Sequence, residues 1–538
     1  MYWVVILILA VALLGPMAGL FAHVDKAAFI ETMQSAQFLK ALNITLLSSC
    51  GGAVFSLIIA ILLARSFATH EWKLKRLQRL IILIPYLVPN FILATAYVIA
   101  WNPVTGLLNG VMPFPSRLYG LYGMTIVFGI AHAPLAFLLL EDKFKRIDNS
   151  LREAAKLSGA NQTTILAKIE LPLLKPTILS AFGLCFALNI SAFAIPAWIG
   201  APERAYTLTY KIYQVLQVGG SDGLPRASVF SIVLFLLSIP PLLVTGWIQR
   251  REQMFTTLSG KAAKTGGESW SKRGFMLFQI FFWVTQTFFW IAPLLCLAAS
   301  TLVKPGCLQT SGISCFNDMS LKSYSYVLFD LSETHAAFWG SIVYGTLSAA
   351  IIMFVAVTTI ICFSNRPLHL KTAEWLFSLP VATPGAIIAL GLIVSCSGKY
   401  GLNIYNTPYI AVAAYVIKHI NLAFQPLRTG YATVSRSIFE AARISGASPA
   451  RVWRDIMLPI LRPEVLGGFF LVLIPILGEL TMSIFLTSPS FKSIGTVLFD
   501  LQDYADQSSA AALSIVLVIL VLATNKLAHF LSKGKLGY

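Results

Sequence analysis

A polar motif with the residue types of a docking element occurs twice in this chain. A glutamate can pair with a basic group on a partner, two adjacent alanines leave one side of a helix almost without bulk, and a glycine permits a left-handed turn. Equivalent positions in the two copies lie 287 residues apart. The residue types favour binding of a protein partner over catalysis. The motif consists of Glu153, Ala154, Ala155 and Gly159 in the first copy and Glu440, Ala441, Ala442 and Gly446 in the second.

Each copy predicts a helix–turn–helix bracket. Ser150 and Glu153, like Ser437 and Glu440, have the spacing of a capping box at a helix start. The glycine would end this helix, and a second helix would follow and run to a Leu-Pro pair. We call residues 150–172 the first bracket and residues 437–459 the second bracket. The two glutamates either only cap their helices or also contact a partner.

Four ionisable residues lie within apolar stretches, where charged groups are costly and often functional. His132 and His419 are again 287 residues apart, Lys418 adjoins the second histidine, and Glu479 lies near the end of a later stretch. His132, His419 and Glu479 are candidates for lining or gating a path, and the alternative for the histidines is hydrogen bonding between helices. No cluster of His, Cys, Asp and Glu has metal-ligand spacing, so the sequence predicts no metal site.

The composition excludes a soluble globular protein. Of the 538 residues, 57% are hydrophobic and only 12% are charged, and the mean hydropathy is +0.75, whereas soluble domains are roughly 25% charged. Apolar runs of about 20 residues, the length that crosses a bilayer, recur twelve times. The predicted fold class is therefore an all-α polytopic membrane protein with about 12 transmembrane helices.

The net charge of +17 reports topology rather than nucleic-acid binding. With the N-terminus in the cytoplasm, 28 of the 40 Lys and Arg residues fall in the segments assigned to the cytoplasmic side. Because short cytoplasmic loops are enriched in Lys and Arg, this pattern predicts that both termini and both brackets are cytoplasmic.

The chain has seven cysteines, five of which lie in apolar runs and are expected to be core thiols. Cys307 and Cys315 share one loop on the predicted outside, where oxidising conditions permit a disulfide. The sequence leaves open whether they form one.

The duplication predicts two homologous halves with a linker between them. Residues 1–249 form the first half, 250–274 a polar linker, and 275–538 the second half. Six spans separate the brackets, so the two six-helix repeats are parallel. Each half also contains two prolines four residues apart, near the start of its third span, where a kink or an unwound turn is expected.

The bracket motif, Glu-Ala-Ala, three residues, Gly, and a Leu-Pro pair about twelve residues later, resembles the cytoplasmic loop of permease subunits of bacterial binding-protein-dependent ABC importers. The resemblance covers essentially the whole chain and is closest to the fused permeases of the ferric-iron and thiamine importer group. Residues 193–209 and 478–485 are also similar to that group. The fold implied is that of a type I ABC importer permease in the bacterial inner membrane.

The resemblance implies that the brackets are coupling helices, each held by one of two cytoplasmic ATPase subunits. An external binding protein, periplasmic or lipid-anchored, would deliver a small solute such as ferric iron or thiamine, and residues 200–226 and 488–507 are candidates for its docking surface. ATP and magnesium would bind to the partner ATPase. The chain lacks a Gly-x-x-x-x-Gly-Lys-Ser/Thr loop, so we expect no enzymatic activity and no cofactor in it.

Two other classes of protein remain as alternatives. A twelve-helix secondary transporter driven by an ion gradient would share the parallel repeat, but it would have no reason for two brackets. A membrane enzyme would need a nucleophile–base pair or a ligand cluster, and the sequence offers neither in equivalent places of the two halves.

Overall fold

The protein is described by a computed structural model that covers residues 2–22, 24, 26–108, 118–255, 272–304, 307, 312–398, 402–504 and 506–531. Most of the predicted linker lies outside these residues. The described part is almost entirely helical, which confirms the all-α fold class. Nine of its helices are long and apolar enough to cross a membrane, or up to 12 if each of three bent helix pairs counts as one span.

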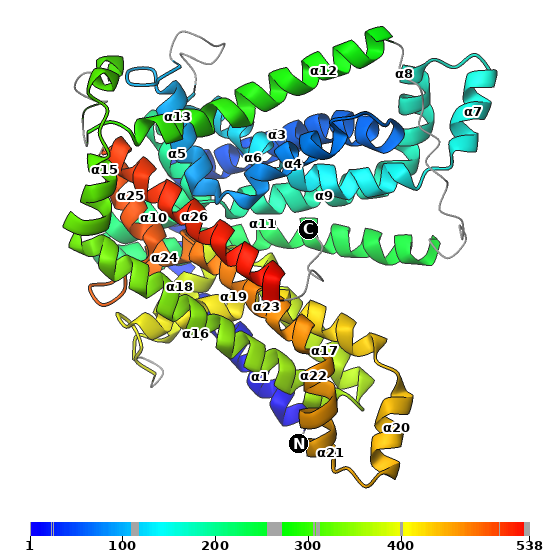
Figure 1. Cartoon of the computed structure of the whole chain (residues 1–538). Coiled ribbons are helices and arrows are strands. Elements are labelled where there is room, and N and C mark those ends of the chain that lie inside the picture. Colours follow the sequence, from blue (N-terminus) through cyan, green and yellow to red (C-terminus); the bar gives the residue numbers. More distant parts are fainter. Residues whose placement is uncertain are drawn as a thin grey trace. The chain divides into compact units, whose positions relative to one another are not determined.

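The chain forms two compact units. Unit N comprises Glu31–Gln214 with Val233–Met319, and unit C comprises Met1–Ile30, Val215–Ile232 and Ser320–Tyr538. Figure 1 shows the helices of both units, labelled along the chain.

Unit N is built around three mutually packed helices, α3, α6 and α9. Ser56 on α3 donates a hydrogen bond of 2.8 Å to the carbonyl of Gly129 on α6. A Cβ atom on Gly52 would lie 2.6 Å from the Cβ of Phe128, so small residues allow the two backbones to approach closely, as is common between membrane helices. The principal helices of unit N are α3 (Ala36–Thr69), α4 (Lys75–Leu87), α5 (Asn90–Trp101), α6 (Gly120–Lys145), α7 (Asn149–Leu157), α8 (Gln162–Ile165), α9 (Leu171–Ser191), α12 (Lys272–Gln286) and α13 (Ala292–Ser300).

Unit C has a corresponding core in which α16, α19 and α23 pack together. Helices α10 (Leu208–Val218) and α11 (Gly220–Phe255) each have some residues assigned to unit N and the rest assigned to unit C. The principal helices of unit C are α1 (Tyr2–Ala22), α16 (Ser332–Phe363), α17 (Pro367–Ala382), α18 (Gly385–Ser395), α19 (Pro408–Thr433), α20 (Arg436–Ile444), α21 (Pro449–Val452), α22 (Leu458–Ile460), α23 (Arg462–Leu477), α24 (Thr481–Leu486), α25 (Ile494–Asp503) and α26 (Gln507–Leu531).

The first helix of each sequence half packs within the unit built mainly from the other half. In unit C, α1 lies against α17 and α18, so closely that a Cβ on Gly391 would be 2.4 Å from the carbonyl oxygen of Pro16 (Figure 1). In unit N, α13 packs on α5, and Tyr97 donates a hydrogen bond of 2.7 Å to the carbonyl of Phe289. The predicted boundaries 1–249 and 275–538 describe the duplicated sequence, whereas the compact units interleave these halves.

The paired prolines coincide with sharp helix breaks. Helices α4 and α5 meet at 97°, and α17 and α18 meet at 101°. Pro89 and Pro384 immediately precede α5 and α18, where a proline's missing N–H costs no intrahelical bond. The predicted kinks are therefore complete breaks in the helix, which leave backbone carbonyls and amides to be satisfied by other groups.

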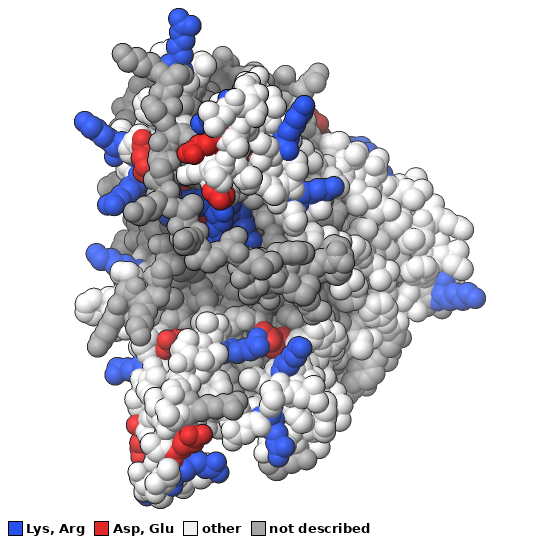
Figure 2. Space-filling view, turned by 90° about the vertical axis from the view of Figure 1, so that its right-hand side faces the viewer, with Lys and Arg blue, Asp and Glu red and all other residues white. Residues whose placement is uncertain are grey.

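Large apolar side chains are exposed along the long helices. Val11 on α1, Leu243 on α11 and Phe354 on α16 are each more than 60% exposed. Figure 2 shows a broad white area with few charged side chains beside the region where Lys, Arg, Asp and Glu gather. Lipid is the environment in which such a surface is stable.

Candidate functional site

Both brackets begin with a capped helix, but the cap lies two residues before the predicted serine. Asp148 caps α7 by accepting a hydrogen bond of 3.0 Å from the Ser150 amide, and Ser435 caps α20 in the same way. Glu153 and Glu440 are the fifth helical residues, beyond the position that a capping box requires. The predicted capping boxes are therefore wrong, because a better N-cap residue precedes each serine. The hydrogen bond from Ser150 lowers the pKa of Asp148 from 3.8.

The turn of each bracket depends on its glycine. Gly159 has φ +81° and Gly446 has φ +78°, a left-handed conformation that glycine adopts without steric cost. In the first bracket the Gly159 amide donates to the carbonyl of Lys156, and the following amide donates to the carbonyl of Ala155. The second bracket repeats both bonds. These bonds satisfy carbonyls at the helix end and fix the turn.

The second helix of each bracket starts where the sequence predicted. Asn161 caps α8 and Ser448 caps α21. Each short helix continues into a single π-helical turn, Leu166–Glu170 or Trp453–Met457, which ends at the Leu-Pro pair. Proline cannot supply an amide to the carbonyl four residues earlier, and a π-turn accommodates this loss.

The predicted docking residues divide between two faces of the bracket. Glu153, Ala154, Glu440 and Ala441 are exposed, whereas Ala155 is half-buried and Ala442 is buried. One alanine of each pair therefore faces the protein, and the other faces outward with the glutamate. The outward side of the first helix, which carries the small alanine side chain and the glutamate, forms a surface that a partner could contact.

Sequence reasoning missed the most exposed apolar residues of the brackets. Leu157 is 89% exposed and Ile444 is 87% exposed, and they occupy equivalent positions two residues before the turn glycine. The sequence does contain a signal for these residues: an apolar residue stands at the same position in two otherwise polar loops. Isolated large side chains held out on a short rigid helix have the character of interface anchors.

The first bracket is attached to unit N by a buried ionic cluster. The Glu170 carboxylate, which is fully buried, accepts from Arg152 Nε at 2.6 Å and from Arg65 Nε at 2.5 Å. Arg152 also donates to the side chain of Asn149 and to the carbonyl of Phe144. One carboxylate thus joins both helices of the bracket to α3.

The second bracket is attached to unit C by apolar contacts instead. Phe439 stands at the position of Arg152, and Met457 at the position of Glu170. Met457 is fully buried and belongs to an apolar cluster with Ala442, Val452 and Leu461, against which Phe439, Tyr431 and Trp453 pack. The two brackets therefore have the same backbone and opposite chemistry at their attachment.

Glu479 lies at a break between two helices in unit C. Its carboxylate accepts hydrogen bonds of 2.9 Å and 3.1 Å from the amides of Met482 and Ser483, at the start of α24. The Ser483 hydroxyl also lies within hydrogen-bond distance of Tyr415, at 2.7 Å. The carboxylate occupies the position where a helix N-terminus attracts an anion.

Lys418 lies at the other break in the same unit. Its Nζ donates to the carbonyls of Thr383 at 2.7 Å, Val381 at 3.1 Å and Pro380 at 3.4 Å, at the end of α17. The ammonium therefore satisfies carbonyls that the break leaves free, and it interacts electrostatically with Glu479. These carbonyl partners could not be predicted from the sequence, because they depend on how the broken helix folds back.

The two histidines lie in different units. His419 is buried in unit C, and its Nε2 has no hydrogen-bond partner in the described part of the chain. His132 is buried in unit N, where its carbonyl accepts from Cys185 at 3.9 Å. Within the described ranges, no group of three or more His, Cys, Asp and Glu residues could hold a metal ion.

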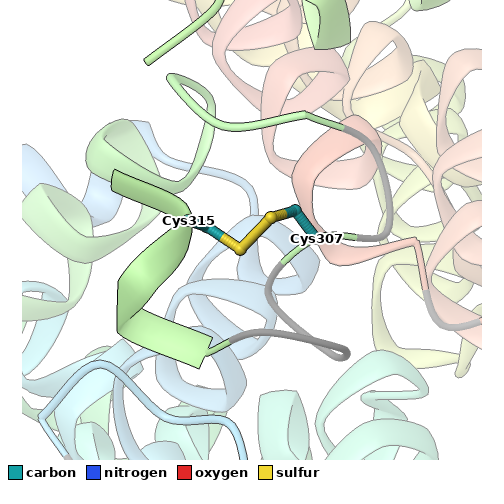
Figure 3. The surroundings of a disulfide bond; sticks show 2 residues. All are labelled: Cys307 and Cys315. Carbon is teal, nitrogen blue, oxygen red and sulfur yellow. A yellow bond between two sulfur atoms is a disulfide. The ribbon is translucent and has the colours of Figure 1, made fainter. Parts of the chain in front are cut away.

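The structure joins Cys307 and Cys315 by a disulfide bond (Figure 3). Cys315 is buried with Val303 in a small apolar cluster, against which Leu107 and Phe316 also pack. The bond closes a short loop that follows α13.

A protein-family model for inner membrane components of binding-protein-dependent transport systems matches residues 52–253 and 370–534. The chain is 24% identical over 412 residues to the Fe(3+)-transport system permease protein FbpB 2 of Haemophilus influenzae, covering 75% of each chain. It is 32% identical over 160 residues to a putative 2-aminoethylphosphonate transport system permease protein, PhnV, of Salmonella typhimurium, covering 29% of this chain and 60% of that protein. A bacterial alginate ABC transporter in complex with its periplasmic protein is 18% identical with a TM-score of 0.40, covering 50% of this chain and 98% of that chain.

Proposed function

Because the chain belongs to the inner membrane components of binding-protein-dependent transport systems, we propose that it is a two-half permease of an ATP-driven importer. It is a multi-pass protein of the inner membrane. In the proposed assembly, each bracket docks on one of two cytoplasmic ATPase subunits, which bind ATP and magnesium. The chain itself hydrolyses nothing, and both of its termini lie in the cytoplasm.

The observation that carries this proposal is the equal geometry of the two brackets. Both present an exposed glutamate and alanine, a glycine turn and an anchor, Leu157 or Ile444, on a rigid pair of helices. A loop that only reversed the chain direction would need a few residues. Two matching surfaces suit a pair of identical or similar partner subunits, and this pairing is not expected of a transporter driven by an ion gradient.

Glu479, His419 and His132 are our candidates for the translocation path or its gate. Glu479 supports this role best, because it is an ionisable group at a helix break within the apolar part of unit C. The segments 200–226 and 488–507, which include α10, the start of α11 and α25, would receive the external binding protein. The disulfide between Cys307 and Cys315 would then lie on the outer, oxidising side.

Ferric iron is the substrate we propose to test first, since an iron permease matches most of the chain. The relative named for 2-aminoethylphosphonate matches a shorter part at higher identity, so an anionic organophosphonate is the second candidate. Thiamine follows from the sequence resemblance alone.

The test is copurification of the detergent-solubilised chain with its ATPase, comparing the wild type with Gly159→Asp plus Gly446→Asp. Both positions have open space for a side chain, so the double variant strains each turn by about 1–2 kcal/mol and adds charge to the docking surface without crowding the core. Gly220→Asp is the matched control, because Gly220 also has a positive φ and open space but lies outside the brackets.

We expect the ATPase to be retained by the wild type and by the control and to be lost from the double variant. Retention by all three proteins would overturn the docking role of the brackets. A wild type that purifies alone and transports in vesicles driven only by an ion gradient would instead support a secondary transporter. Uptake of radioactive iron, organophosphonate or thiamine by vesicles containing the assembled complex would then identify the substrate.

A further inference from the structure

A groove of about 570 Å³ lies between α19 and α23 in unit C. Its lining includes neither Lys418 nor Glu479 nor any residue of the second bracket. Five of its nine lining residues carry an amide, hydroxyl or carboxylate group, and none of the nine is aromatic. They are Asn421, Leu422, Gln425, Pro426, Thr429, Gly430, Thr433, Glu464 and Leu471.

The polar lining comes mainly from one face of α19. Asn421, Gln425, Thr429 and Thr433 are spaced four residues apart, so they lie one above another on the same side of the helix. Helix α19 is one of the candidate membrane spans. A continuous polar face is costly against hydrocarbon, so we expect this face to border water, which the groove beside it would admit.

Several of the polar hydrogens beside the groove already have partners within the protein. The hydroxyls of Thr429 and Thr433 donate to backbone carbonyls of α19, at 3.0 Å and 2.7 Å. The amide nitrogen of Gln425 is directed to Oε1 of Glu374 and to Oδ1 of Asn421, each at 3.4 Å. These hydrogens are used within the protein, while the hydroxyl and amide oxygens, each with two lone pairs, can still accept or coordinate.

Glu464 adds a negative charge to this set of oxygens. Its Oε2 atom is buried and has no hydrogen-bond partner among the described residues. The nearby carboxylate of Glu374 differs, because it forms an ion pair with Arg428. Gly430 makes room for Glu464, since a Cβ at that position would lie 2.6 Å from the Glu464 Cγ.

We propose that this groove is a cation-binding station of the transport path, with the Glu464 carboxylate as its charged ligand. The ligand class is a hard, oxygen-seeking metal cation that keeps part of its water, because carboxylate, amide and hydroxyl oxygens suit such ions. An organic cation such as thiamine would be expected to contact aromatic faces, which the lining lacks. The proposal rests on the proposed function for the groove's place in a transport path.

The test measures Mn²⁺ binding to the purified full-length chain by the loss of the free-ion EPR signal. The first variant is Glu464→Gln, which keeps the shape of the side chain and removes its charge. The second is Gly430→Ala, which displaces Glu464 without changing any charge. Glu71→Gln is the control, because Glu71 is an exposed carboxylate that forms an ion pair with Lys75 four residues away and lies far along the chain from the groove.

We expect Glu464→Gln to weaken Mn²⁺ binding by about tenfold or more, as loss of a supporting group does at metal sites. Gly430→Ala should weaken it less, and Glu71→Gln should leave it unchanged. An excess of thiamine should not displace Mn²⁺. In the assembled complex, Glu464→Gln should slow iron uptake while the ATPase still copurifies.

Equal Mn²⁺ binding by the wild type and Glu464→Gln would overturn the station, as would displacement of the ion by thiamine. Loss of binding in Glu71→Gln to the same extent would show nonspecific surface binding and would also overturn it. Failure of the wild type to retain an ATPase would contradict the proposed function instead, whatever the EPR titration shows. The two proposals therefore fail on different measurements.

Discussion

Glu170 and Met457 occupy equivalent positions in the two brackets, yet Glu170 is a buried carboxylate held by two arginines and Met457 is fully buried among apolar side chains. The two brackets thus share one fold, but the first bracket is attached to its unit by ionic contacts and the second bracket by apolar packing. Buried ion pairs are sensitive to loss of one partner, whereas apolar clusters lose stability gradually with lost volume.

The first bracket should therefore be destabilised by Arg152→Met. This change leaves Glu170 with Arg65 alone and removes the bonds to Asn149 and to the Phe144 carbonyl, which should cost about 3 kcal/mol. Hydrogen exchange of the α7 and α8 amides would measure the loss. The double variant Arg152→Phe plus Glu170→Met copies the second bracket and should recover part of the protection. Unchanged exchange in the single variant would contradict the anchoring role of the cluster.

The start of α7 in the first bracket should also respond to acid through its cap, whereas the cap of α20 in the second bracket should not. The pKa of Asp148 is lowered from 3.8 in the folded protein by the Ser150 amide. Its capping contribution is therefore complete above about pH 4 and is lost as the pH falls through the lowered pKa. Ser435, which caps α20, does not titrate in this range.

Exchange of the α7 amides relative to the α20 amides, measured from pH 6 down to pH 3, would check this difference. Protection of α7 should fall relative to α20 only at the acid end. Asn caps helices without titrating, so Asp148→Asn should remove the pH dependence. Parallel behaviour of α7 and α20 in the wild type would show that the Asp148 cap is not what holds the helix start.

The exposed anchors of the brackets should matter for partner binding and not for folding. Leu157→Ser plus Ile444→Ser removes two side chains that are almost fully exposed, so the melting temperature of the chain alone should not change. If both are interface anchors, each should contribute about 2 kcal/mol to ATPase binding. Val104→Ser is the control, since Val104 is 88% exposed outside the brackets. Normal ATPase copurification with the double variant would rule out the anchor role.

Lys418 and Glu479 should be energetically coupled. Lys418→Met leaves the carbonyls at the end of α17 unsatisfied and the Glu479 charge without its nearby cation, which should lower stability by about 1–3 kcal/mol. A double-mutant cycle with Glu479→Gln, followed by thermal unfolding, measures the coupling. The double variant should be less destabilised than the sum of the single changes. Strict additivity would mean that the two charges do not support each other.

The sequence predicted those features that depend on local chemistry. The turn glycines, the second-helix caps at Asn161 and Ser448 and the proline breaks are each set by a few neighbouring residues, and all are present in the structure. The first caps were misplaced because Asp148 and Ser435 compete with the nearby serines, and local pattern alone does not decide between adjacent cap residues.

Features that depend on distant residues could not be predicted in this way. The partners of Lys418 are carbonyls 35 to 38 residues away, and the ionic cluster joins Arg65 to Glu170 across 105 residues. The groove at Glu464 likewise requires α19 and α23 to be packed side by side. Individual polar residues in these helices gave no sign of which of them would meet.

Helix α1 packs in unit C, which is built mainly from the second half of the chain, and this affects how the protein folds during its synthesis. Helix α17 begins 345 residues after α1 ends, so at roughly 5–20 residues per second the ribosome needs about 20–70 s to deliver the partner of α1. During that interval α1 lies in the bilayer without α17 and α18, the helices on which it packs in the folded protein. Its residues, Tyr2–Ala22, include no charged side chain. The helix is therefore stable in lipid until the last third of the chain is synthesised.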